Sequence, residues 1–134
     1  MKIGLLGGSF DPIHKGHIEI ASEAITSLSL DSFYFIPTKN NPWKDNQNAP
    51  GASRKEMIEI AIHQDPKMKV CTIELDSLSN EKNYTIDTIH ALKKMYPDDT
   101  LYYLMGMDQA MAFEKWKNAE DISKLVQLVA FNRG

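Results

Sequence analysis

Short apolar runs alternate with helical patterns along the whole chain. Between the runs, apolar residues recur at helical spacing, as in Ile18, Ala21 and Ile25, with Glu19 and Glu23 on the other side. The apolar runs end at turn residues or at a change of pattern, and they predict strands at residues 3–6, 33–36, 69–74, 101–105 and 127–131. This alternation predicts an α/β fold, a Rossmann-like parallel sheet of about five strands with helices on both faces.

Start signals locate the helices that connect these strands. The first is expected from Gly16, and Ser53 to Glu56 form a capping box that predicts a second helix starting near Arg54. Arg54 and Lys55 then belong to a solvated helix start, and the apolar positions behind them are Met57, Ile60 and Ala61. Thr85 is the expected N-cap of a third helix, which is buried through Ile86, Ile89 and Leu92. Two short helical segments are expected at residues 109–112 and 120–124.

Length, composition and charge narrow the class of protein. The 134 residues suit one domain, 1–134, and 43% hydrophobic with 25% charged residues is typical of a globular chain. A net charge of -3 argues against binding to a nucleic-acid polymer. The single cysteine, Cys71, excludes an intrachain disulfide and fits a reducing compartment. With neither a signal-peptide pattern nor a long apolar span, we expect a cytoplasmic protein without a membrane segment.

Ligands of parallel α/β sheets bind at the carboxyl ends of the strands. The first such segment, residues 7–17, places two glycines before His14 and His17 at the expected start of a helix. Glycines let the chain approach a ligand closely, and a helix N-terminus favours an anion. Histidines three residues apart lie on one helix face, so both imidazoles can face one phosphate. The simpler interpretations are a surface pair or half of a metal site, but no third ligand lies nearby, so no protein-bound metal is expected.

The run G-G-S-F-D-P-I-H-K-G-H resembles the HxGH signature of the nucleotidyltransferase superfamily, and most closely its nicotinate-nucleotide adenylyltransferase branch, with Ser9 in place of the usual threonine. Further matches are R-K-E-M at residues 54–57, Y-T-I-D-T at 84–88, and G-M-D at 106–108 followed by Trp116. The similarity covers essentially the whole chain. The branch segment written P-P-H-K or N-P-x-K corresponds to N-N-P-W-K at residues 40–44, where Trp43 stands in the place of histidine in many members and is given no role.

The resemblance implies a set of site residues. The catalytic ones are His14, His17 and Lys44, and the two histidines also bind ATP phosphates. The residues implied for the rest of ATP are Gly8, Ser9, Phe10, Gly106 and Asp108, with Asp108 accepting hydrogen bonds from the ribose. Thr85 and Trp116 would bind the mononucleotide, the indole stacking on the nicotinate ring. Each has a plainer alternative, since Trp116 could be a core aromatic, Thr85 a helix cap and Lys44 a solvated lysine.

The implied reaction is adenylyl transfer from ATP to nicotinate mononucleotide, which gives nicotinate adenine dinucleotide and pyrophosphate. The substrates are the expected partners, and Mg²⁺ is expected to arrive on the ATP phosphates. The family's later I-S-x-T-x-x-R element is missing from this sequence, which supports an alternative of a different class, a truncated domain that binds nucleotide without catalysis. Such a truncation would expose a sheet edge and favour association, including homo-oligomers. Phosphopantetheine and glycerol-phosphate nucleotidyltransferases of the same fold are the alternative enzymes.

Overall fold

The computed structural model describes residues 1–8, 10, 13–38, 51–75, 85–116 and 118–131. Strands and helices alternate through these residues, as the hydrophobic pattern predicts. In chain order they are β1 (Lys2–Gly8), α1 (Lys15–Leu28), β2 (Ser32–Pro37), α2 (Gly51–Ile62), β3 (Met68–Val70), α3 (Thr85–Met95), β4 (Thr100–Gly106), α4 (Met107–Met111), the 3-10 turn η1 (Phe113–Lys115), α5 (Ala119–Leu125) and β5 (Gln127–Phe131).

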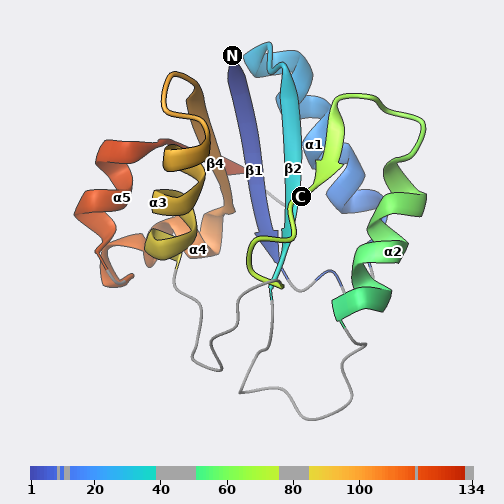
Figure 1. Cartoon of the computed structure of the whole chain (residues 1–134). Coiled ribbons are helices and arrows are strands. Elements are labelled where there is room, and N and C mark those ends of the chain that lie inside the picture. Colours follow the sequence, from blue (N-terminus) through green and yellow to red (C-terminus); the bar gives the residue numbers. More distant parts are fainter. Residues whose placement is uncertain (9, 11–12, 39–50, 76–84, 117, 132–134) are drawn as a thin grey trace, which may run out of the picture.

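The strands form one parallel five-stranded sheet in the order β3-β2-β1-β4-β5. The chain moves outward from β1 through β2 to β3, then crosses back to place β4 on the other side of β1. This reversal creates a switch point between β1 and β4, where sheets of this kind bind ligands. Because all the strands run in one direction, the ends of β1, β2 and β4 share one edge, at which α2 and α3 begin (Figure 1). The predicted α/β fold with a five-stranded parallel sheet is confirmed.

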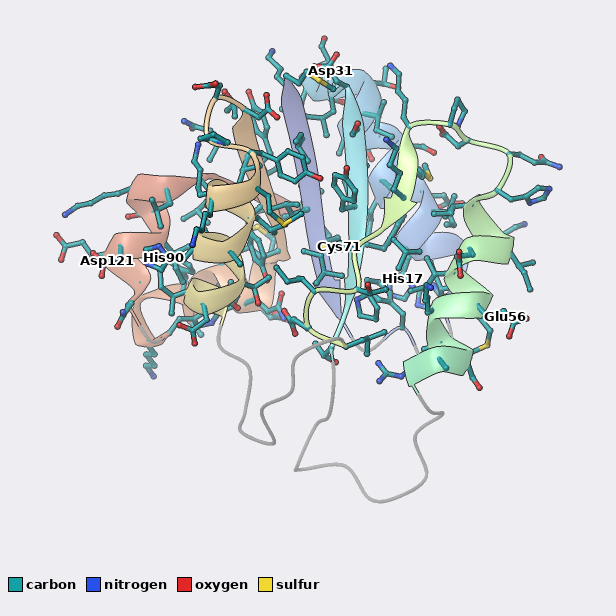
Figure 2. All side chains as sticks on the ribbon, in the orientation of Figure 1. His17, Asp31, Glu56, Cys71, His90 and Asp121 are labelled. Atoms are coloured by element: carbon teal, nitrogen blue, oxygen red, sulfur yellow. The ribbon has the colours of Figure 1, made fainter. Side chains whose placement is uncertain are left out.

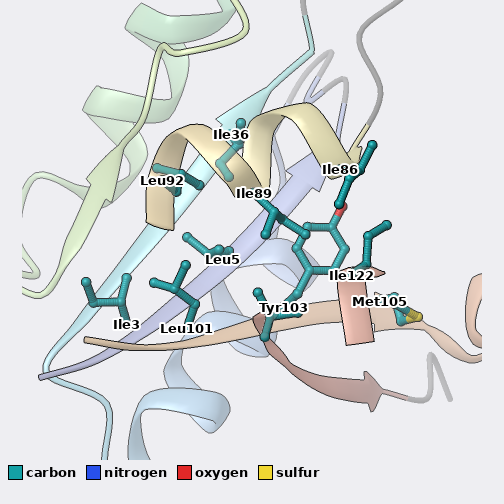
Figure 3. Close-up of a cluster of buried hydrophobic side chains, with 11 residues drawn as sticks. Ile3, Leu5, Ile36, Ile86, Ile89, Leu92, Leu101, Tyr103, Met105 and Ile122 are labelled. Atoms are coloured by element: carbon teal, nitrogen blue, oxygen red, sulfur yellow. The ribbon is translucent and has the colours of Figure 1, made fainter. Parts of the chain in front are cut away.

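Helices cover both faces of the sheet, with α1 and α2 on one face and α3 and α5 on the other (Figure 1). Alternate residues of each strand therefore enter one of two buried clusters. The cluster under α3 contains Leu5, Tyr103 and Ile89 among others (Figure 3). The cluster under α1 and α2 contains Leu6, Phe33 and Ala21 among others. Both faces are apolar, which explains why the strands appear in the sequence as continuous apolar runs.

Gly4 of β1 lets the side chains of Phe33 and Leu30 pack directly against the strand, on the face covered by α1. A Cβ atom at this position would lie 2.6 Å from Phe33 Cδ2 and 2.7 Å from Leu30 Cδ1. Leu30 and Phe33 are 1% and 0% exposed, so neither side chain has room to withdraw. The missing side chain at Gly4 is therefore required by packing across β1 and β2.

The predicted start of α2 is wrong. The helix begins at Gly51, so Ser53 lies inside its first turn and is not the cap of a box that ends at Glu56. The buried face is also rotated from the predicted one, because Ile58 and Ile62 are buried whereas Ile60 is 66% exposed. Arg54 shares the buried face at 5% exposure, so its predicted solvation is wrong as well. Arg54, Ile58 and Ile62 are four residues apart and share the face of α2 that packs on the sheet. This packing, and not the local capping residues, decides the buried face of the helix.

Other boundaries differ by smaller amounts. The strand predicted at 69–74 ends at Val70, and residues 73–75 form a turn. Thr85 is the first residue of α3 and not the residue before it, and α4 starts two residues earlier than predicted, directly after β4. In the part of the chain that the structure describes, no helix has the length and apolarity needed to cross a membrane.

Candidate active site

His14 and His17 hold the start of α1 by capping each other. His14 is the N-cap residue, in extended conformation, and its Nδ1 accepts a hydrogen bond from the Gly16 backbone N–H at 3.1 Å. His17 Nδ1 accepts one from the His14 backbone N–H, also at 3.1 Å. Because Nδ1 is the acceptor in both rings, the neutral imidazoles carry their proton on Nε2. We call this arrangement of His14, Gly16 and His17 the histidine cap.

The two imidazole rings of the histidine cap lie close together at the start of α1. The two imidazole rings stack with their centroids 3.8 Å apart and their planes 28° apart. His14 is exposed and His17 half-buried, and Figure 2 shows His17 on the α1 side of the sheet. Two Nε2–H groups beside a helix N-terminus suit a phosphate, which accepts hydrogen bonds and is favoured by the helix dipole. The structure thus brings together the two histidines that the sequence singled out.

Phe10 packs between the histidine cap and the hydrophobic core. Its φ is 47°, the left-handed region that bulky residues rarely adopt. Its ring is 3% exposed and contacts both Phe35 and His17 at steep interplanar angles. Because Phe10 is buried, its expected contact with ATP is a prediction for the main chain and not for the ring. A conformation of this kind costs about 1–3 kcal/mol and is concentrated at functional sites.

A second group of polar residues lies on the opposite face, under the start of α3. Tyr103 of β4 is 9% exposed, and Thr85 makes a side-chain hydrogen bond to it. Burial raises the pKa of Tyr103, the bond from Thr85 opposes this, and the nearby Glu74 carboxylate adds to the rise. A Cβ at Gly7 would lie 3.3 Å from the Tyr103 hydroxyl oxygen, so this hydroxyl lies against the end of β1.

Glu74 and Trp116 complete this group. Thr88, 7% exposed on α3, donates to Glu74 Oε2 at 3.0 Å, and burial raises the pKa of Glu74 despite this bond. The Trp116 ring meets Tyr103 nearly at right angles, with centroids 6.2 Å apart. We call Glu74, Thr85, Thr88, Tyr103 and Trp116 the tyrosine network. Sequence reasoning gave no role to Glu74, Thr88 and Tyr103. Thr88 lies within the Y-T-I-D-T match, and the signal for the other two was polar side chains within otherwise apolar patterns.

Trp116 combines its two predicted interpretations. It is half-buried, it packs against the cluster under α3, and Phe113 contacts it with centroids 5.2 Å apart. The indole is therefore fixed by core contacts and yet keeps part of its surface accessible. A ring held in this way is preorganised for stacking, although its contact with a nicotinate ring stays a prediction.

Gly106 is the last residue of β4, the strand that pairs with β1 up to Leu5 and Tyr103, and Asp108 follows it in α4. Gly106 is the N-cap of α4 and is half-buried, and Asp108 is in the first turn and exposed. The carboxylate is thus accessible at the switch point of the sheet, where the sequence predicts the ribose of ATP. Two other predicted site residues, Ser9 and Lys44, lie outside the described residues.

The geometry defines a class before any relative is considered. An α/β domain with strand order 3-2-1-4-5, two histidines at the helix start after its first strand, and an exposed aspartate after β4 has a Rossmann-like fold.

Comparison with known proteins narrows this class. Residues 5–134 match the Cytidylyltransferase-like family. The probable nicotinate-nucleotide adenylyltransferase of Shouchella clausii (strain KSM-K16) is 41% identical over 98% of this chain and 68% of its own length. The nicotinate-nucleotide adenylyltransferase of Bacillus subtilis (strain 168) is 34% identical over 98% and 69%. The chain belongs to the cytidylyltransferase-like family and, within it, to the nicotinate-nucleotide adenylyltransferases. It spans about two thirds of the length of these relatives.

Solved structures share the fold at lower sequence identity. A putative nicotinate-nucleotide adenylyltransferase from Vibrio parahaemolyticus superposes with a TM-score of 0.77 at 20% identity, over 98% of this chain and 73% of that one. The nicotinic acid mononucleotide adenylyltransferase of Plasmodium falciparum, in complex with NaAD, gives 0.73 at 21% identity, over 98% and 74%. These likenesses show that this chain shares the fold of these two structures.

Proposed function

We propose that this chain transfers the adenylyl group of ATP to nicotinate mononucleotide. A phosphate oxygen of the mononucleotide attacks the α-phosphorus of ATP. The bond from that phosphorus to the oxygen that bridges the α- and β-phosphates breaks. The products are nicotinate adenine dinucleotide and pyrophosphate. This displacement needs no protein nucleophile, so catalysis consists of aligning two anions and stabilising the negative charge of the transition state.

The histidine cap is the observation that carries this proposal. Its two Nε2–H groups lie next to the N-terminus of α1, where a phosphate chain can accept hydrogen bonds from both rings and from the helix. His14 and His17 stabilise charge on the departing pyrophosphate in this proposal. Lys44 would add a mobile positive charge to the same phosphates.

The two substrates would bind on opposite sides of the switch point. Gly8, Ser9 and the Phe10 main chain would line the phosphates, and Gly106 and Asp108 would hold the adenosine, with the Asp108 carboxylate accepting from the ribose hydroxyls. Thr85 and Trp116 would bind the mononucleotide next to the tyrosine network. The Tyr103 hydroxyl lies against Gly7 of β1, the strand that leads to the histidine cap, so this arrangement would bring the two reacting phosphates together.

Magnesium enters this proposal with ATP. In the described part of the chain, no group of three His, Cys, Asp or Glu residues could hold a metal ion. A Mg²⁺ ion carried by phosphates fits such a site, because Mg²⁺ keeps several waters and needs few protein ligands. When bound, it would neutralise part of the phosphate charge, and orientation of the substrates would remain with the protein residues.

The test is pyrophosphate release from ATP and nicotinate mononucleotide, with His17→Ala compared to His90→Ala. His90 is an exposed histidine of α3, on the other side of the sheet (Figure 2). Loss of one transition-state donor lowers kcat about a hundredfold to a thousandfold, so we expect this for His17→Ala and unchanged turnover for His90→Ala. Near wild-type turnover by folded His17→Ala would refute the proposed mechanism.

Two further outcomes would refute the proposed activity itself. ATP binding by calorimetry without pyrophosphate release would favour the non-catalytic nucleotide-binding domain. Turnover of phosphopantetheine and not of nicotinate mononucleotide, in a competition assay, would favour a different nucleotidyltransferase of the same fold.

A further inference from the structure

The Phe10 ring connects the hydrophobic core to one histidine of the cap. On the core side its centroid lies 5.6 Å from that of Phe35, with the planes 81° apart. On the site side it lies 5.0 Å from the His17 ring, with the planes 79° apart. A Cβ at Gly8 would be 3.4 Å from Phe10 Cζ, so the end of β1 also contacts the Phe10 ring. The ring is immobilised by these contacts, and His17 packs against it.

The backbone of Phe10 shows that this placement is specific. Left-handed φ angles are normally taken by glycine, and Gly7 and Gly8 come just before this residue. Among the described residues, however, no glycine has a positive φ, whereas Phe10 has one of 47°. The chain thus makes this unfavourable turn with a buried aromatic residue, and the turn directs the ring between Phe35 and His17.

His17 needs such support because its two ring orientations are not equivalent. In the observed orientation, Nδ1 accepts the His14 N–H at 3.1 Å. Rotating the imidazole by half a turn would replace Nδ1 with a carbon atom, which breaks the cap and moves Nε2. The stacked His14 ring is exposed, so it is a less rigid support. The Phe10 ring, buried and nearly perpendicular to the imidazole, is a rigid neighbour that limits this rotation.

We infer that Phe10 is a positioning residue, whose ring holds the His17 imidazole in the orientation that places Nδ1 on the His14 N–H. This inference deepens the proposed function and rests on it for its effect on turnover. The orientation of His17 itself can be measured without any substrate.

The test compares Phe10→Leu with Phe35→Leu. Both changes replace a buried phenylalanine of the same cluster, but only Phe10 contacts His17. We expect both variants to lose thermal stability, and only Phe10→Leu to lose kcat, by about tenfold to a hundredfold, while the KM for ATP changes little. Long-range ¹H–¹⁵N NMR, with His17 assigned by substitution, should show one Nε2–H tautomer in the unsubstituted protein and mixed tautomers in Phe10→Leu.

Three results would overturn the inference. These are a His17 proton on Nδ1 in the unsubstituted protein, an unchanged tautomer and kcat in Phe10→Leu, and an equal loss of kcat in Phe35→Leu. If Phe10→Leu does not fold, Phe10→Met fills more of the buried volume, and the same expectations apply to it. If the unsubstituted protein has no adenylyl transfer activity, the proposed function fails, and the NMR comparison still decides whether Phe10 positions His17.

Discussion

The histidine cap and the tyrosine network lie at the same edge of the sheet and are built in different ways. The cap uses residues within four positions of one another, and its two hydrogen bonds run from backbone N–H groups to side chains. The network takes residues from α3, β4, the turn after β3 and the segment after η1. Its contacts join side chains that are 14 or more positions apart or that belong to different elements.

This difference separates two ways of holding a functional group. The cap is exposed at His14, and its two hydrogen bonds depend on the local path of the chain, with Phe10 packed against His17. The network is largely buried, and its geometry depends on how α3 packs over β4. Changes that affect the local backbone should therefore disturb the cap without unfolding the protein, whereas changes in the network should couple binding to stability.

Gly16→Ala disturbs the cap alone, and its effect on turnover is expected to be larger than that of changes in the tyrosine network. The new Cβ would lie 3.0 Å from His14 Cε1 and 3.1 Å from Nδ1, so the exposed ring must shift by a few tenths of an ångström, which weakens its hydrogen bond from the Gly16 N–H. We expect kcat to fall about tenfold. Stability should hold or rise by up to about 1 kcal/mol, because alanine favours helix over glycine.

Turnover and thermal unfolding measure these two effects. Ser22→Ala, on the exposed side of the same helix, is the matched control and should leave kcat unchanged. A parallel loss of stability and kcat in Gly16→Ala would show that the cap is not separable from the fold.

Tyr103→Phe tests the network with a smaller change. It removes the hydroxyl that Thr85 bonds to and keeps the ring contact with Trp116. One buried hydrogen bond contributes about 1 kcal/mol, so we expect the KM for nicotinate mononucleotide to rise roughly fivefold, with the KM for ATP unchanged and Tm lowered.

Tyr34→Phe is the control for this change. The Tyr34 hydroxyl lies 3.3 Å from that of Tyr96, and burial with this bond raises the pKa of Tyr34 to about 12. It too should lower Tm, without an effect on either KM. If the two variants behave alike, the tyrosine network is structural only.

The smallest effect is expected for Glu74→Gln. It tests whether the tyrosine network contains a buried carboxyl, through the pH dependence of Tm. Burial raises the pKa of Glu74 above its ordinary 4.5, so the folded protein binds this proton more tightly than the unfolded chain does. That contribution to stability is complete below 4.5 and is lost as pH rises through the folded pKa. Glutamine does not titrate and still accepts from Thr88.

The Tm of Glu74→Gln minus that of the unsubstituted protein should therefore become more positive between about pH 4 and about pH 7. Glu56→Gln, on the exposed side of α2, measures the effect of losing one charge. A difference in Tm that stays constant with pH, or becomes more negative, would contradict a raised pKa of the buried Glu74 carboxyl.

Prediction from sequence worked best where one short segment contained the whole signal. The strands at β1, β2, β4 and β5 lie where their apolar runs predict them, and His14 and His17 meet as their spacing requires. It failed at α2, where local capping residues suggested a start near Arg54 and a face through Ile60. Burial of Ile58 and Ile62 against the sheet decided otherwise.

By itself, the sequence determined the parallel α/β fold and the histidine pair, because hydrophobic periodicity and a three-residue spacing are local properties of the chain. Only the tertiary structure decided that Phe10 takes a left-handed conformation beneath His17, and that Glu74, Thr88 and Tyr103 meet near Trp116. These arrangements depend on which side chains share a buried space. That is fixed by the packing of helices onto the sheet, and no short stretch of sequence encodes it.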